Sequence, residues 1–126
     1  MDILIAESQS RVRYALTILI QKEAGWHVLG WAVHCRELLS RLPTLDPDVL
    51  LLDWNLPGME ADQLLPEIFR IKNGLQVVMM SADPGVRQTA LALGVSHFVS
   101  KMDPPDRLVE LLKLCSKPHP QNEYQA

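Results

Sequence analysis

Short apolar runs alternate along the chain with longer stretches in which apolar residues recur at helical spacing. Runs that are apolar or rich in β-branched residues predict five strands, at residues 3–6, 26–33, 48–52, 75–80 and 96–100. The intervening periodic stretches predict helices over about residues 9–24, 37–42, 64–71, 86–93 and 108–115. The pattern is therefore five strands, each followed by a helix.

This order of elements predicts an α/β fold. Strands separated by helices pair in parallel through right-handed crossovers, which gives a doubly wound sheet with helices on both faces. The run from Asp48 to Leu52 is apolar without alternation after its first residue. Because only strands covered on both faces lose the alternating pattern, we expect this strand to be central.

Composition limits the classes of function. A chain of 126 residues with 48% hydrophobic residues fits one globular domain, predicted over residues 1–116, with residues 117–126 as a tail or linker. The net charge of -3, without a dense basic run, argues against nucleic-acid binding by this segment. Apolar runs such as Val49–Leu52 are too short to span a membrane. Cys35 and Cys115 suggest neither a disulfide framework nor a zinc site, which fits a cytoplasmic protein.

Polar residues follow four of the predicted strands. In a doubly wound sheet, ligands bind outside the carboxyl ends of the strands, so these side chains mark the candidate site. The residues at these ends are Glu7 and Ser8, Asp53, Ser81, and Lys101. Two acids, hydroxyl groups and an amine suit phosphoryl transfer: a carboxylate nucleophile, oxygens for a hard cation, and donors for phosphoryl oxygens.

Four motifs occur in order along the chain: ILIAE at residues 3–7, VLLLDWNLPGM at 49–59, MSA at 80–82 and FVSK at 98–101. Together they resemble the receiver domain of two-component response regulators, over about residues 2–115. The resemblance implies a flavodoxin-like sheet in the order 2-1-3-4-5. It implies that Asp53 accepts a phosphoryl group from a sensor histidine kinase, that Lys101 contacts the phosphate, and that Ser81 and Phe98 are the switch residues.

One position departs from the family's pattern. Such receivers usually carry two acids after the first strand, and the second, a magnesium ligand, falls on Ser8. The resemblance implies a Mg²⁺ site of Glu7, Asp53 and the backbone carbonyl of Asn55, with Ser8 as a weak or vacant position. From the residues alone, Ser8 is also a candidate helix N-cap, Glu7 a solvated rim acid, and Ser81 a partner for a local backbone group.

Three functional hypotheses follow. The first is a phosphorylated receiver, not a turnover enzyme, that switches the face of residues 86–112 to control an output domain, a protein partner or a homodimer. Residues 102–105 resemble receivers that precede a DNA-binding output domain, which suggests transcriptional regulation. The second is a pseudo-receiver that binds partners without phosphorylation because of Ser8. The third is a flavin-binding electron carrier, which the weak phosphate loop at residues 8–10 disfavours.

Overall fold

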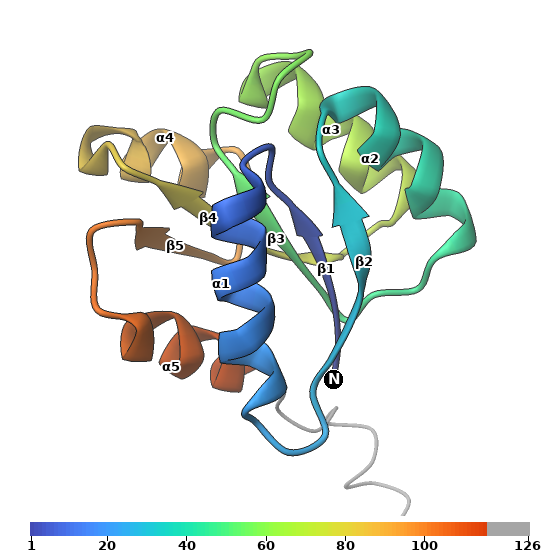
Figure 1. The fold of residues 1–126 in the computed structure, drawn as a ribbon. Coiled ribbons are helices and arrows are strands. Elements are labelled where there is room, and N and C mark those ends of the chain that lie inside the picture. Colours follow the sequence, from blue (N-terminus) through green and yellow to red (C-terminus); the bar gives the residue numbers. More distant parts are fainter. Residues whose placement is uncertain (116–126) are drawn as a thin grey trace, which may run out of the picture.

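The computed structural model describes residues 1–115 and contains one five-stranded parallel sheet (Figure 1). The strands lie in the order β2-β1-β3-β4-β5, so both the predicted fold class and the predicted strand order are confirmed. Their bounds are β1 Asp2–Ala6, β2 His27–Ala32, β3 Val49–Asp53, β4 Gln76–Ser81 and β5 His97–Ser100. The prediction for residues 117–126 lies outside the described residues.

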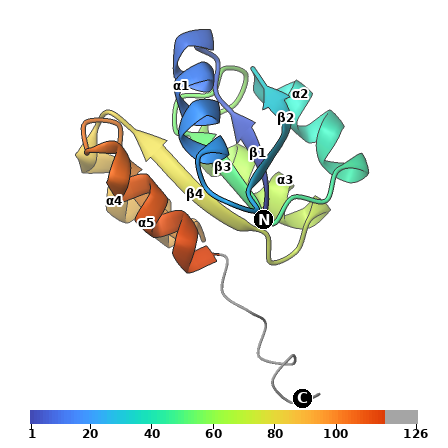
Figure 2. The ribbon, with the colours of Figure 1, turned by 60° about the horizontal axis from the view of Figure 1, so that its bottom comes forward.

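Five α-helices connect and cover the strands in the described part of the chain. Helices α1 and α5 pack on one face of the sheet, and α2, α3 and α4 pack on the other (Figures 1 and 2). Short 3₁₀ turns follow α2 and precede α4. The helices are α1 Ser10–Gln21, α2 Cys35–Arg41, α3 Ala61–Ile71, α4 Arg87–Ala92 and α5 Pro105–Cys115.

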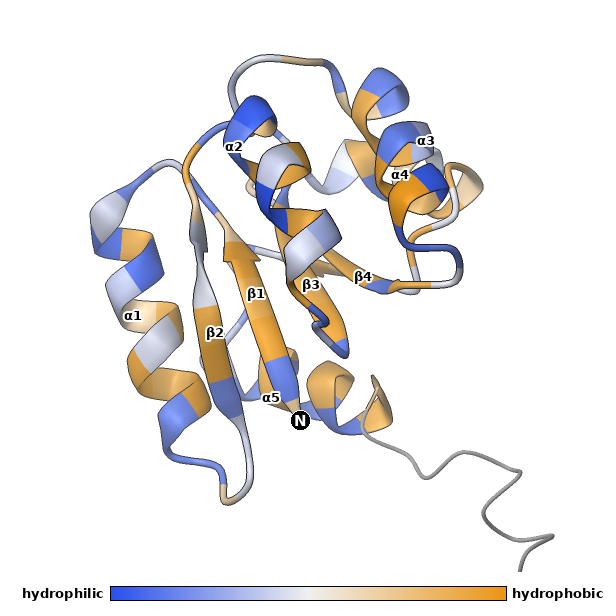
Figure 3. Cartoon of the chain, turned by 90° about the vertical axis from the view of Figure 1, so that its right-hand side faces the viewer, coloured by the Kyte–Doolittle hydropathy of each residue, from blue (hydrophilic) through white to orange (hydrophobic). Residues whose placement is uncertain are grey.

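Successive residues of the central strands contribute to two separate cores. In β3, Leu50 and Leu52 pack with α2 and α3, whereas Val49 and Leu51 pack with α1 and α5. All five residues of β3 are buried, as its continuous apolar sequence predicts. Figure 3 shows β1 and β3 as mostly hydrophobic, whereas the edge strand β2 is mixed. The hydrophobic pattern therefore places β3 at the centre of the sheet.

The prediction that Ser8 is an N-cap is wrong. Helix α1 begins at Ser10, and its N-cap is Gln9, which makes no side-chain capping bond. The connection after β1 is instead fixed by other contacts: the Gln9 amide donates to the Glu7 carboxylate, and Arg13 donates to the carbonyls of residues 7 and 8. Ser8 itself is exposed.

No helix within residues 1–115 combines the length and the apolar character needed to cross a membrane.

Candidate functional site

The parallel register brings the predicted site residues to one edge of the sheet. Asp53 is the last residue of β3 and pairs with Met80, and Ser81 ends the neighbouring strand β4. Glu7 follows β1, and Lys101 follows β5. The structure therefore gathers Glu7, Asp53, Ser81 and Lys101 where the carboxyl ends of the strands meet.

Lys101 connects the two acids. Its ammonium donates to Glu7 Oε1 at 2.8 Å and lies 3.2 Å from Asp53 Oδ1. Glu7 is 0% exposed and Asp53 is 6% exposed, so both carboxylates are removed from bulk water. The interpretation of Glu7 as a solvated rim acid is therefore wrong.

The pKa of Lys101 shows the balance of forces at this point. Burial of the ammonium lowers the pKa, but the hydrogen bond that Lys101 donates to Glu7 and the negative charges of Asp53 and Glu7 outweigh burial, and the pKa of Lys101 is raised. Lys101 is thus held as a cation between two carboxylates at neutral pH.

Both oxygens of Glu7 are engaged. Oε1 accepts from Lys101, and Oε2 accepts from the backbone N–H of Gln9 at 3.1 Å. A buried carboxylate with a fixed partner on each oxygen has one preferred orientation. Glu7 is therefore pre-positioned on the side of the cluster where β1 ends.

Ser81 is buried and makes a local bond. Its Oγ accepts from the backbone N–H of Asp83 at 3.0 Å, and Asp83 Oδ1 accepts from the N–H of Gly85 at 2.8 Å. The expected local backbone partner of Ser81 is present. A move of this hydroxyl toward Asp53 would have to exchange that bond for another.

Asn55 lies in a tight turn after β3. The N–H of Leu56 donates to the carbonyl of Asp53 at 3.1 Å and closes this turn. The turn is fastened to the start of α2, because the Cys35 N–H donates to the Pro57 carbonyl at 2.8 Å and its thiol donates to the Leu56 carbonyl at 3.4 Å. These contacts with Cys35 at the start of α2 hold the turn that contains Asn55 in place beside Asp53.

Phe98 and Ser8 stand apart from the acid–lysine cluster. Phe98 is buried at the start of β5 and packs in the core on the α4 side of the sheet. Ser8 is exposed, and its backbone carbonyl accepts from Arg13. Neither side chain contributes to the ion pairs of Lys101.

The donor set suits a hard divalent cation, but it is small. The described residues contain no group of three or more His, Cys, Asp or Glu side chains placed to hold a metal ion. Mg²⁺ is usually bound through one or two carboxylates together with phosphate oxygens and water. The carboxylates of Glu7 and Asp53 and the nearby Asn55 carbonyl fit that pattern, without a third acid at residue 8.

The sequence did not predict three groups that hydrogen-bond to residues of the candidate site. They are the Gln9 N–H, the Arg13 side chain and the Asp83 N–H. The Gln9 and Asp83 contacts use backbone N–H groups, which every non-proline residue carries, so no sequence signal marks them. Arg13 lies one helical turn after Gln9, and that spacing is the one signal that would place it near the turn after β1.

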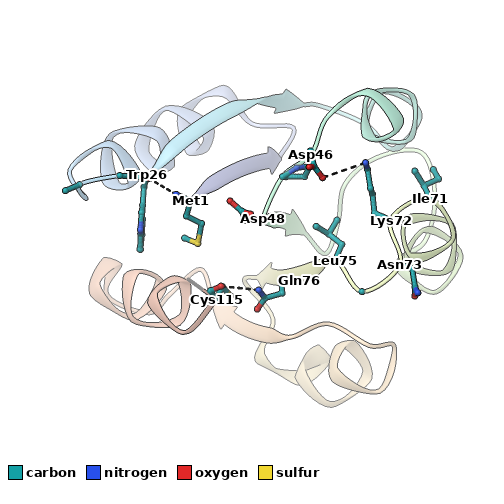
Figure 4. A pocket seen from close by; sticks show the side chains of 14 residues that line it. Met1, Trp26, Asp46, Asp48, Ile71, Lys72, Asn73, Leu75, Gln76 and Cys115 are labelled. Carbon is teal, nitrogen blue, oxygen red and sulfur yellow. Dashed lines mark hydrogen bonds and ion pairs between the residues drawn. The ribbon is translucent and has the colours of Figure 1, made fainter. Parts of the chain in front are cut away.

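A cavity of 670 Å³ lies at the opposite edge of the sheet from the acid–lysine cluster (Figure 4). It is formed where β1, β3 and β4 begin, and its charged groups already have partners. Asp48 accepts from the N–H of Asp2 at 2.7 Å, and Asp46 lies 4.0 Å from Lys72. The cluster around Asp53 is therefore the stronger candidate.

Comparisons with known proteins agree with this assignment of the fold. The model of the response regulator receiver domain family matches residues 3–113. The chain is 30% identical over 117 residues to the chemotaxis protein CheY of Thermotoga maritima, covering 91% of this chain and 97% of that protein. The chain therefore belongs to the receiver domain family and is the receiver domain of a response regulator.

Two further similarities involve longer proteins. A protein-glutamate methylesterase/protein-glutamine glutaminase of Treponema pallidum is 33% identical over 103 residues, which cover 79% of this chain and 26% of that relative. The structure of RcsB from Salmonella enterica serovar Typhimurium bound to promoter rprA in the presence of phosphomimetic BeF3- has a TM-score of 0.86 at 24% identity. That match covers 94% of this chain and 61% of RcsB and shows the shared fold.

Proposed function

We propose that this domain accepts a phosphoryl group on Asp53 from the phosphohistidine of a sensor histidine kinase, in the cytoplasm. The observation that carries the proposal is the buried cluster in which Lys101 bridges Glu7 and Asp53 at the carboxyl edge of the sheet. The family membership and the position of Asp53 at the end of β3 support it.

In the transfer, a lone pair of an Asp53 carboxylate oxygen attacks the phosphorus atom. The new P–O bond forms as the P–N bond of the phosphohistidine breaks, and the bond pair returns to the imidazole nitrogen, which takes up a proton. The kinase supplies the phosphoryl group and the domain supplies the nucleophile, so the domain is a substrate and not a turnover enzyme.

The chain's own charges prepare this step. The ammonium of Lys101 already faces Asp53 and would neutralise part of the charge that the phosphoryl oxygens bring. Glu7, Asp53 and the carbonyl of Asn55 would hold Mg²⁺, and Ser8 adds a weak ligand or none. When bound, Mg²⁺ supplies charge neutralisation and orientation of the phosphoryl oxygens.

Ser81 and Phe98 would transmit the effect of phosphorylation from Asp53 to the rest of the domain. Phosphorylation adds about 1.5 to 2 negative charges. The Ser81 hydroxyl would then exchange the Asp83 N–H for a phosphoryl oxygen, and the packing of Phe98 beneath α4 would adjust. The face of α4, β5 and α5 would bind an output domain, a protein partner or a second copy. The fold shared with RcsB favours a transcriptional output.

The test is an amide NMR titration of the ¹⁵N-labelled chain with Mg²⁺ and then with beryllofluoride. We expect shifts at Asp53, Ser81 and Lys101 that spread across the face of residues 86–112. The Asp53→Asn variant is the matched control and should show none of them. A parent chain that responds to neither reagent would contradict the proposal.

The second candidate is a pseudo-receiver that binds its partner without phosphorylation. The neutral, exposed Ser8 favours it, because the site holds one carboxylate fewer than the family's usual set. In this case the face of residues 86–112 would bind its partner equally well in the parent and in Asp53→Asn. Loss of partner binding in Asp53→Asn would exclude it.

A further inference from the structure

Arg13 and Trp31 form a clamp on the turn that carries Glu7. Arg13 Nη1 donates to the carbonyls of Glu7 and Ser8, both at 2.9 Å. These carbonyls belong to the two residues that leave β1 and lead into α1. One guanidinium nitrogen therefore fixes two successive peptide groups of the acidic turn.

The other side of the guanidinium is covered by the edge strand. The carbon atom at the centre of the Arg13 guanidinium lies 5.4 Å from the centroid of the Trp31 ring. Arg13 Nε is buried, and it has no hydrogen-bond partner within residues 1–115. A guanidinium that lies over an aromatic ring at this distance makes a cation–π contact, so Arg13 is held by the ring as well as by its acceptors.

Trp31 is itself tied to the same helix. Its indole N–H points to Thr17 Oγ1 at 3.4 Å, and the Thr17 hydroxyl donates to the carbonyl of Arg13 at 2.8 Å. Trp31 is 43% exposed, which is unusual for so large an aromatic residue at a sheet edge. Its position is explained by contacts with Arg13 and Thr17 more than by burial.

We propose that Arg13, which lies over the Trp31 ring, is a positioning residue of the phosphoryl-transfer site that holds the turn of residues 7–8 so that Glu7 presents its carboxylate to Lys101 and Asp53. The inference rests on the proposed function for its catalytic meaning. Because residue 8 is a serine, Glu7 is the one acid of this turn, and the site depends on its orientation. Partners that orient a ligand side chain are worth about 10- to 100-fold in metal affinity.

The Gln9 amide provides a direct reporter of that orientation. Its N–H donates to Glu7 Oε2, so its amide chemical shift depends on where the carboxylate lies, with or without Mg²⁺. A loss of global stability alone leaves this shift in the folded population unchanged. The reporter therefore separates positioning from a merely structural role.

The experiment compares ¹⁵N-labelled variants of the 126-residue chain. In Arg13→Ala, we expect a displaced Gln9 amide without Mg²⁺ and a Mg²⁺ midpoint raised about tenfold. Arg11→Ala removes the same charge from an exposed position on the same helix. It should leave the Gln9 amide shift at its parent position and the Mg²⁺ midpoint within twofold of the parent value. Equal behaviour of the two variants would overturn the inference.

Trp31 supplies a second test that avoids the risk of misfolding. Trp31→Leu removes the ring from a half-exposed position, and it should displace the Gln9 amide in the same direction as Arg13→Ala, by a smaller amount. Trp31→Phe keeps a ring and should stay close to the parent. A Gln9 amide in Trp31→Leu that matches the parent would contradict the clamp.

Failure of the inference is distinguishable from failure of the proposed function. A parent chain without any response to Mg²⁺ or beryllofluoride contradicts phosphorylation, whatever the variants do. The Gln9 comparison in metal-free buffer still decides whether Arg13 positions Glu7.

Discussion

Replacing Lys101 by methionine tests how strongly the buried acids depend on their shared cation. The change removes the bond to Glu7 at 2.8 Å and the ion pair with Asp53 at 3.2 Å, while it keeps most of the side-chain volume. Glu7, which is 0% exposed, would keep the Gln9 N–H and lose its charged partner. The folded state is therefore left with two buried carboxylates and no cation between them.

The size of the expected loss in the free energy of unfolding follows from the burial of the Lys101 ion pairs. Removing one partner of a fully buried pair costs about 3–5 kcal/mol, and the 24% exposure of the Lys101 side chain reduces this to about 2 kcal/mol through solvent screening. For a domain of this size, that loss corresponds to a fall in Tm of about 8 °C. Urea denaturation and thermal scans at pH 7 measure both quantities.

Two variants complete the design. Lys22→Met removes an exposed lysine at the end of α1 and should change the free energy of unfolding by less than about 0.5 kcal/mol. Adding Glu7→Gln to Lys101→Met should recover about 1 kcal/mol, because the uncompensated charge is then gone. A Lys101→Met variant as stable as Lys22→Met would show that the buried acids do not depend on Lys101.

The contribution of Lys101 to stability depends on pH with a definite sign. The folded pKa of Lys101 is raised above its ordinary value of 10.5, so its contribution is fully present below pH 10.5 and is lost as the pH rises through the folded pKa. The stability difference between the parent and Lys101→Met should therefore shrink above that pH. A difference that stays constant there would contradict the ion-pair account.

Three further results are expected. Ser8→Asp should tighten Mg²⁺ binding about tenfold by adding a carboxylate, measured by quenching of Trp54 fluorescence, and unchanged affinity would count against this. Gly58→Ala should lower the free energy of unfolding in urea by about 1 kcal/mol more than Gly74→Ala. Both glycines have positive φ, but only at Gly58 would the new Cβ lie 3.3 Å from Cys35, the first residue of α2. Burial raises the pKa of Cys115 to about 11, so iodoacetamide should label it far more slowly in the folded than in the urea-unfolded protein at pH 8.5, and equal rates would contradict its burial.

The fold was predictable because local pattern and burial agree. The central strands β1, β3 and β4 contain short apolar runs, and the run ending at Leu52 is buried on both faces, as its lack of alternation indicates. Element ends were less predictable. Helix α1 ends at Gln21 and not near residue 24, because periodicity marks the buried face of a helix and not its last turn.

The location of the acid–lysine cluster was predictable, since strand ends mark one edge of a parallel sheet. The contacts within the site were not. Glu7 is buried because Lys101, 94 residues later in the chain, reaches it, and no local pattern encodes that pairing. The backbone bonds from Gln9 and Asp83, and the Arg13 clamp, depend equally on tertiary structure.

The proposed function requires Asp53 to accept a phosphoryl group. The most direct test is the intact mass of the protein after incubation with acetyl phosphate and Mg²⁺, with Asp53→Asn treated in parallel. We predict a mass gain of one phosphoryl group on the parent alone. The same incubation with Mg²⁺ chelated should give no gain. No gain at any Mg²⁺ concentration, or an equal gain on Asp53→Asn, would contradict the claim.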